Sequence, residues 1–292
     1  MPGIFLRGIA MGSADVVPGV SGGTVAFITG IYERLIQSLS AFDLEAVKLL
    51  FKGEIAAAWR RVDGAFLLCL LAGIACAVLT LARGISFLLD TQPVLIHAVF
   101  FGLISGSAWV ITRQISGWNA RIALSFLLGI ALMLLLAAAR PEQLPLEPHW
   151  LFIGGSLAIC AMILPGLSGS FILLMLGLYE PVLEAIKRFD IVVMLWFAAG
   201  CGVGLLSFVR VLKFLLERFY QAVLAFLSGL LVASLTVIWP WKLQLSEWQV
   251  VNVSPYTYQA QQGEAQLIVA CVFACLAAAL VLVVERWAGR AH

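Results

Sequence analysis

Two short runs of proline, glycine and hydroxyl residues interrupt an apolar sequence, and their residue types suit anion binding. They read Pro18-Gly19-Val20-Ser21-Gly22-Gly23-Thr24 and Pro165-Gly166-Leu167-Ser168-Gly169-Ser170. Proline ends a preceding helix, and serine caps a following one, whose first amides lack intrahelical acceptors. The helix dipole adds partial positive charge there, so phosphate is a natural ligand. The residues that we assign to the phosphate site are Ser21, Gly22, Gly23, Thr24, Ser168, Gly169 and Ser170.

The two runs belong to an internal repeat. Pro18, Gly30 and Glu33 recur 147 positions later as Pro165, Gly177 and Glu180, and a second set recurs at an offset of 127. The first copy has 20 extra residues in between. Three full membrane crossings separate the two runs, an odd number, so we predict that the second copy is inverted. Interrupted segments at matching positions of inverted halves indicate the binding site of a transporter.

Two arginines occupy equivalent positions of this repeat, Arg83 and Arg210. Each could contact a phosphate at its own side of the membrane, because guanidinium binds phosphate through several hydrogen bonds. Each could equally be an interface arginine whose charged end reaches water. The sequence leaves both interpretations open.

Three acidic residues are candidates for gating or for ion coupling. Glu33 and Glu180 each follow a tyrosine, and each could instead lie at a solvated helix end. Asp15 precedes the first run and has no counterpart, because Met162 stands at the equivalent position. A carboxylate among apolar membrane residues is a candidate functional group.

The composition excludes an ordinary soluble protein. Of 292 residues, 62% are hydrophobic and 12% are charged, and the mean hydropathy is +1.04. Soluble domains are about half apolar and about a quarter charged, so lipid is the expected solvent. All six cysteines lie in apolar stretches without metal-ligand spacing. We therefore predict no metal site, no catalytic residue, no cofactor and no nucleic-acid partner.

We predict an all-α polytopic membrane protein with two inverted-topology repeats, over residues 1–140 and 141–292. Each repeat has a re-entrant helical hairpin, whose arms are too short for a full crossing, and three transmembrane helices. The hairpins are expected over 3–40 and 150–183, and an amphipathic helix on the membrane surface over 44–61. The transmembrane helices are expected over 64–82, 93–112, 120–139, 191–209, 220–239 and 265–284.

The basic residues predict the orientation. With this topology, 13 lysines and arginines lie on the side of the N-terminus and 5 on the other. The positive-inside rule then places both termini in the cytoplasm. The expected location is the bacterial cytoplasmic (inner) membrane.

The runs Gly12–Thr24 and Leu164–Ser170 resemble the polyprenyl-phosphate transporter family, as does Gly229–Ser234 with the following Trp239-Pro240-Trp241. The similarity covers nearly the whole chain. It implies a flippase that returns undecaprenyl phosphate, the C55 lipid carrier, from the outer to the inner leaflet for peptidoglycan and other envelope polymers. The expected partners are this lipid and the membrane lipids; a homodimer and coupling to protons or sodium are left open.

Two other functions compete with this interpretation. Membrane undecaprenyl-pyrophosphate phosphatases have a similar hairpin signature, but Gly22 and Gly23 stand where their arginine and serine would be. The cation that stabilises a leaving phosphate is therefore missing. The other alternative is a transporter of a small soluble anion, which would need a sealed aqueous vestibule rather than a lateral opening to lipid.

Overall fold

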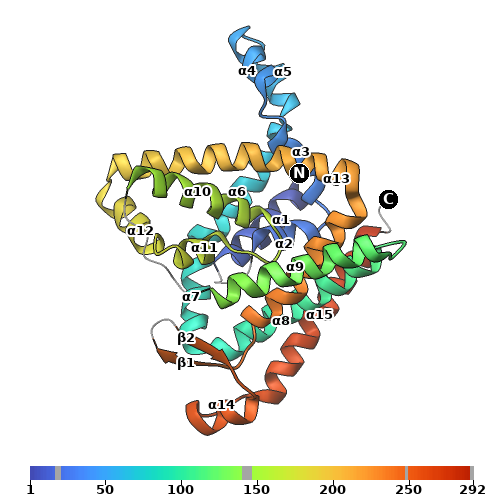
Figure 1. Ribbon diagram of the computed structural model, residues 1–292, viewed down its shortest axis with the longest axis vertical. Helices are drawn as coiled ribbons and strands as arrows, with labels where there is room; N and C mark the ends of the chain where they lie inside the picture. Colours follow the sequence, from blue (N-terminus) through green and yellow to red (C-terminus); the bar gives the residue numbers. More distant parts are fainter. Residues whose placement is uncertain (17–20, 140–146, 247–248, 290–292) are drawn as a thin grey trace. The chain divides into compact units, whose positions relative to one another are not determined.

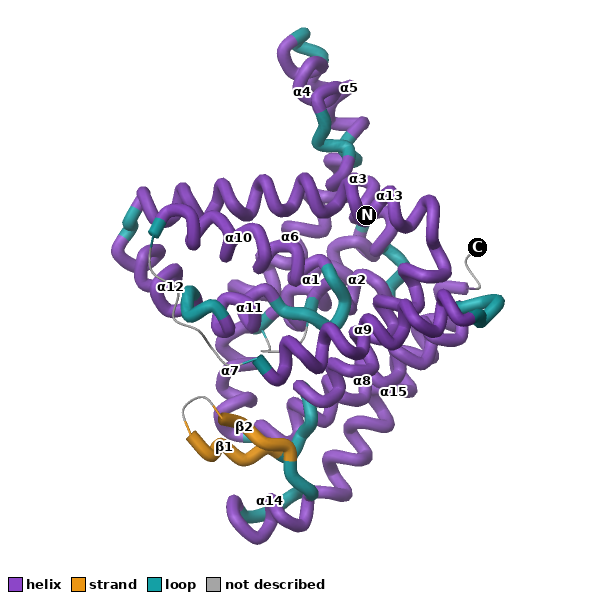
Figure 2. Tube along the Cα trace, in the orientation of Figure 1, coloured by secondary structure: helices purple, strands orange, loops and turns teal. Residues whose placement is uncertain are grey.

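The computed structural model describes residues 1–16, 21–139, 147–246 and 249–289. The chain is mostly helical (Figures 1 and 2). It divides into two compact units, and each combines segments from both halves of the sequence. Unit 1 comprises Met1–Ala82 and Glu142–Tyr220, and unit 2 comprises Arg83–Pro141 and Gln221–His292. The expected boundary between the repeats, at 140 and 141, lies outside the described residues.

Unit 1 contains both regions that carry the proline-glycine runs. Its helices are α1 (Pro2–Asp15), α2 (Gly22–Ile28), α3 (Tyr32–Ser40), α4 (Leu44–Phe51), α5 (Ile55–Arg61), α6 (Gly64–Thr80), α10 (Pro148–Ile163), α11 (Gly169–Met175), α12 (Tyr179–Arg188) and the first part of α13 (Ile191–Val237). The backbones of α1 and α6 pack closely against each other. A methyl group on Gly73 of α6 would collide with the carbonyl oxygen of Phe5, and a methyl group on Gly8 of α1 would collide with the carbonyl oxygen of Leu70. Small residues at such positions are typical of membrane helix pairs.

Each interrupted region is broken a second time, by a glycine at an equivalent position of the repeat. Gly30 separates α2 from α3 with φ +70°, and Gly177 separates α11 from α12 with φ +67°. Such positive φ values suit glycine, which has no Cβ. The axes of α11 and α12 differ by 107°. Each expected second arm is therefore two short helices rather than one.

The segment expected to be one amphipathic helix is also divided. Gly53, with φ +77°, separates α4 from α5, and the pair projects away from the rest of unit 1 (Figure 1). Arg61 donates to Asp43, the residue that caps α4. This hydrogen bond is the main reason why the pKa of the Asp43 carboxyl falls to about 2. The bond ties the two ends of the α4–α5 segment together.

Unit 2 contains α7 (Ala82–Thr91), α8 (Pro93–Gln114), α9 (Ala120–Ala138), the remainder of α13, α14 (Pro255–Gln262) and α15 (Leu267–Gly289). Gly102 and Gly106 on α8 allow close approach of the α15 backbone at Ala274 and Ala278. Gly129 on α9 contacts α13 in the same way. Backbone-to-backbone packing at glycine is thus common to both units.

The expectation of an all-α fold is wrong in one loop. β1 (Lys242–Ser246) and β2 (Gln249–Asn252) form an antiparallel hairpin in which Leu243 pairs with Val251. The alternation of polar and leucine side chains in β1 is the period-two pattern of a strand. The indole of Trp241 donates to the carbonyl of Ala265 and anchors the loop.

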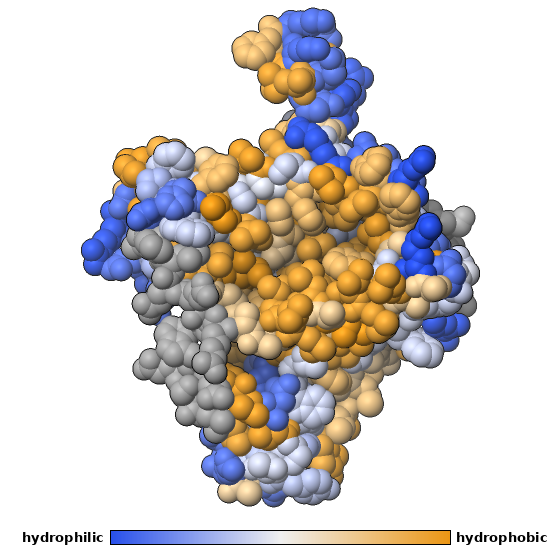
Figure 3. Space-filling view, in the orientation of Figure 1, coloured by the Kyte–Doolittle hydropathy of each residue, from blue (hydrophilic) through white to orange (hydrophobic). Residues whose placement is uncertain are grey.

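Three of the described helices are long and apolar enough to cross a membrane: α8, α9 and α13. The bent pairs α5–α6 and α11–α12 also pass this test when each is taken as one span. α13 has 47 residues and a non-helical Phe219; at ~1.5 Å per residue it is about twice as long as one crossing requires. Each unit exposes many large hydrophobic side chains, such as Leu195 and Val203 in unit 1 and Leu124 and Leu135 in unit 2, and Figure 3 shows part of this apolar surface. Soluble monomers rarely expose such an area, so the fold is that of a membrane protein.

Candidate functional site

The two proline-glycine runs meet inside unit 1. We call Pro18–Thr24 the first tip and Pro165–Ser170 the second tip. The Ser21 hydroxyl lies 3.1 Å from the Met162 carbonyl oxygen and 3.3 Å from that of Leu164, and donates to both. In the other direction, the Gly166 amide donates to the Thr24 hydroxyl at 2.9 Å. The two turns, more than 140 residues apart in sequence, therefore form one polar cluster, which we call the tip cluster. Pro18 and Gly19 of the first tip lie outside the described residues.

The tip cluster is buried among apolar side chains. Ser21 and Thr24 are each 1% exposed, and Ser168 is 6% exposed. Ala26 and Leu167 beside them are also buried. In such surroundings hydrogen bonds to an anion are stronger than in water, and a polar group without a partner is costly.

At the first tip, the protein itself supplies the acceptors for the leading amides of α2. The Gly22 amide donates to the Asp15 carboxylate at 2.7 Å, and the Gly23 amide donates to the Ser21 hydroxyl at 3.1 Å. The Thr24 amide donates to the Ser21 carbonyl at 2.9 Å. A Cβ on Gly22 would lie 2.6 Å from an Asp15 carboxylate oxygen, so the absence of a side chain on Gly22 allows the carboxylate to lie this close. Asp15 thus provides the anion that the dipole of α2 favours.

The second tip lacks this arrangement. Met162 stands at the position equivalent to Asp15, and Ser168 makes no capping hydrogen bond to α11. Its hydroxyl instead lies 2.7 Å from that of Ser170. Among the described residues, no acceptor is hydrogen-bonded to the amides of Gly169, Ser170 or Phe171. The two tips therefore differ: within the described residues, the leading amides of α2 have acceptors and those of α11 have none.

Within the part of the chain that the structure describes, neither arginine of the repeat is hydrogen-bonded to the tip cluster. Arg210 donates to the carbonyl oxygens of Phe42, at 2.7 Å, and Leu206, at 3.1 Å. It thereby holds the turn between α3 and α4. Arg83 is an exposed residue of α7 and belongs to unit 2.

Glu33 and Glu180 lie in the first turns of α3 and α12. Both are exposed, and acidic residues at this position interact favourably with the helix dipole. Glu33 also lines a cavity of about 180 Å³ together with Lys213, Glu217 and Tyr220. The hydrogen bonds place neither glutamate in the tip cluster.

Sequence reasoning missed the acceptors that connect the tips. The carbonyls of Met162 and Leu164 accept from Ser21, and nothing in their side chains marks this role. The contact of Asp15 with Gly22 had a signal in the sequence, because Asp15 is an isolated carboxylate close to a predicted helix start. The sequence therefore identified Asp15 as a candidate residue but did not identify the Gly22 amide as its hydrogen-bond donor.

The apolar helices and the buried polar cluster define a polytopic membrane protein. The chain belongs to the family described as VCA0040-like, undecaprenyl phosphate translocase-like, whose profile matches residues 11–254. This confirms the family predicted from the tip sequences. The chain is 43% identical over 298 aligned residues to the polyprenyl-phosphate transporter of Vibrio cholerae serotype O1, with 97% of this chain and 96% of the relative covered.

A second relative is the polyprenyl-phosphate transporter of Staphylococcus aureus. It is 30% identical over 257 residues, with 81% of this chain and 85% of the relative covered. No solved structure matches the chain. Both relatives are named as transporters rather than enzymes.

Proposed function

We propose that the chain transports undecaprenyl phosphate from the outer to the inner leaflet of the bacterial cytoplasmic membrane. The carrier would thereby return to the synthesis of peptidoglycan and other envelope polymers. The family and the two polyprenyl-phosphate transporters that resemble this chain support the assignment. The substrate consists of a long apolar tail, which can stay in lipid, and a small anionic head, which is costly to bury without partners.

The tip cluster is the proposed shelter for the phosphate head, and the observation that carries this proposal is the direct contact between the two buried tips. The second tip is the better binding surface, because the amides of Gly169, Ser170 and Phe171 and the hydroxyls of Ser168 and Ser170 can all donate to phosphate. The first tip acts mainly as support, because Asp15 and Ser21 already satisfy its amides.

The inverted repeat suggests how the head changes sides. Rocking of one half against the other would expose the tip cluster to each leaflet in turn. Both termini would remain in the cytoplasm. Asp15 is the coupling candidate in direct contact with a tip residue, and the coupling ion would be a proton or sodium. Glu33 and Glu180 would affect gating from the helix starts that they occupy.

The test is a flipping assay in proteoliposomes that contain a polyprenyl phosphate with a fluorophore reducible by dithionite. The double variant Ser168→Ala, Ser170→Ala removes two hydroxyl donors that do not hold the tips together. Each hydrogen bond to a charged group contributes ~1.5–3 kcal/mol, so transport should fall roughly tenfold or more. Ser207→Ala is the control, because this exposed serine donates only to backbone carbonyls around its own helical turn.

Unchanged transport in a folded double variant would remove the second tip from the mechanism. The same vesicles separate the proposal from its main alternative. Release of inorganic phosphate from a polyprenyl pyrophosphate would favour a phosphatase.

A further inference from the structure

A second site lies in unit 2, between the C-terminal parts of α8 and α15. It is a cavity of about 240 Å³. Pockets for drug-sized ligands occupy ~300–1,000 Å³, so this cavity suits a headgroup-sized ligand. The lining residues are Trp109, Val110, Arg113 and Gln114 on α8 and Leu282 and Glu285 on α15.

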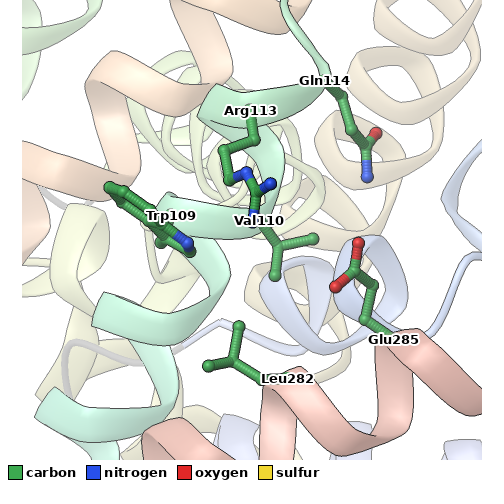
Figure 4. A pocket seen from close by; sticks show the side chains of 6 residues that line it. All are labelled: Trp109, Val110, Arg113, Gln114, Leu282 and Glu285. Carbon is green, nitrogen blue, oxygen red and sulfur yellow. The ribbon is translucent and has the colours of Figure 1, made fainter.

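The cavity presents one positive and one negative side chain. Figure 4 shows Arg113, Gln114 and Glu285 extending from two helices toward the same space. Among the ion pairs of the described residues, none involves Arg113 or Glu285. Two opposite charges beside one cavity without a mutual ion pair favour a ligand that carries both charges.

The surroundings indicate that this ligand is a lipid. Trp109 is 59% exposed, and the Arg113 guanidinium carbon lies 5.8 Å from the centre of its ring. Tryptophan and arginine together at a helix end are typical of the headgroup level of a membrane. Leu282, half-buried on α15, adds an apolar wall for the glycerol end of a lipid.

We propose that this cavity binds the phosphoethanolamine headgroup of a membrane lipid. The guanidinium of Arg113 donates to the phosphate, and the carboxylate of Glu285 and the side-chain oxygen of Gln114 accept from the ammonium. Phosphocholine has no N–H donor for Glu285, and one tryptophan is not the aromatic cage that quaternary ammonium groups require. Phosphatidylglycerol lacks a cation. The site does not depend on the proposed transport function.

Native mass spectrometry of the delipidated full chain in detergent provides the test. Dioleoyl phosphatidylethanolamine should bind more tightly than phosphatidylcholine or phosphatidylglycerol with the same acyl chains. Glu285→Gln should weaken phosphatidylethanolamine binding roughly tenfold, because it removes a charge-assisted hydrogen bond, and should leave phosphatidylglycerol binding unchanged. Arg113→Gln should weaken the binding of both lipids.

Matched controls exist in the same unit. Arg121→Gln removes an exposed arginine at the start of α9, and Glu264→Gln removes an exposed carboxylate in the loop before α15. Neither residue lines the cavity, and neither substitution should change the lipid preference. Soluble phosphoethanolamine, which carries a phosphate and an ammonium group without acyl chains, should compete only weakly.

A measurement on the unaltered protein makes the test independent of variant folding. Successive N-methylation of the lipid removes one ammonium proton at a time, and binding should fall at each step toward phosphatidylcholine. Equal binding along this series would overturn the proposal. So would a phosphatidylethanolamine preference that survives in Glu285→Gln, or full displacement of the lipid by soluble phosphoethanolamine.

Discussion

The contact between Asp15 and Gly22 can be isolated by comparing two neutral variants. Asp15→Ala leaves the buried Gly22 amide without its acceptor, whereas Asp15→Asn keeps an oxygen at the same place. Both changes remove the cost of burying a charge, so this cost cancels in the comparison. A buried donor without a partner costs ~1–3 kcal/mol, and the Asn variant should be more stable by about this amount.

The assay is thermal unfolding of the two purified variants in the same detergent. Asp190 provides the matched comparison, because this exposed carboxylate caps α13 by accepting from the amides of Val192 and Val193. Water can replace the hydrogen bonds of such a cap. The difference in thermal stability between Asp190→Ala and Asp190→Asn should therefore be smaller than the difference between Asp15→Ala and Asp15→Asn. Equal stability of Asp15→Ala and Asp15→Asn would refute the role of Asp15 as the acceptor at the first tip.

Three further results are expected. Thr24→Val should lower the free energy of unfolding by ~1–3 kcal/mol, because the Gly166 amide loses its acceptor, and Thr24→Ser, which keeps the hydroxyl, should retain this stability. Equal melting temperatures of the two variants would contradict this role of Thr24. Gly73→Ala should destabilise the packing of α1 on α6 by ~1–3 kcal/mol, whereas Gly202→Ala, with open space around it, should be tolerated in the same thermal assay. Carboxyl NMR should show an Asp43 pKa of about 2, and this pKa should rise toward 3.8 in Arg61→Gln. Because the pKa in the folded protein is the lower one, the contact contributes its full stability above pH 3.8. This contribution is lost as the pH falls through about 2.

The sequence was most informative where residue chemistry acts locally. α10 ends at Ile163, just before Pro165, as expected from proline as a helix terminator. α2 begins after Ser21, whose hydroxyl caps it by accepting from the Gly23 amide. The apolar composition correctly indicated a mostly helical membrane protein. These features depend on neighbouring residues, so one sequence is enough to predict them.

Features that depend on distant partners or on backbone angles were not predicted. A single glycine inside a helical pattern is usually tolerated, so the breaks at Gly30 and Gly177 could not be distinguished from ordinary helix positions. The sequence offers Arg210 as a possible phosphate ligand, and the structure shows its guanidinium donating to the carbonyl oxygen of Phe42, 168 residues away. The β1–β2 hairpin was missed because its strands are only five and four residues long.

The assembly of each compact unit from two separated segments has a consequence for biogenesis. Unit 1 needs Met1–Ala82 and Glu142–Tyr220 together, so the first six helices leave the ribosome long before the segment that completes their packing. Until then, the Ser21 hydroxyl and the Thr24 side chain lack their partners from the second tip. During insertion, the nascent chain must therefore carry polar groups that still lack their hydrogen-bond partners. Unit 1 can complete its packing only when most of the protein has been synthesised.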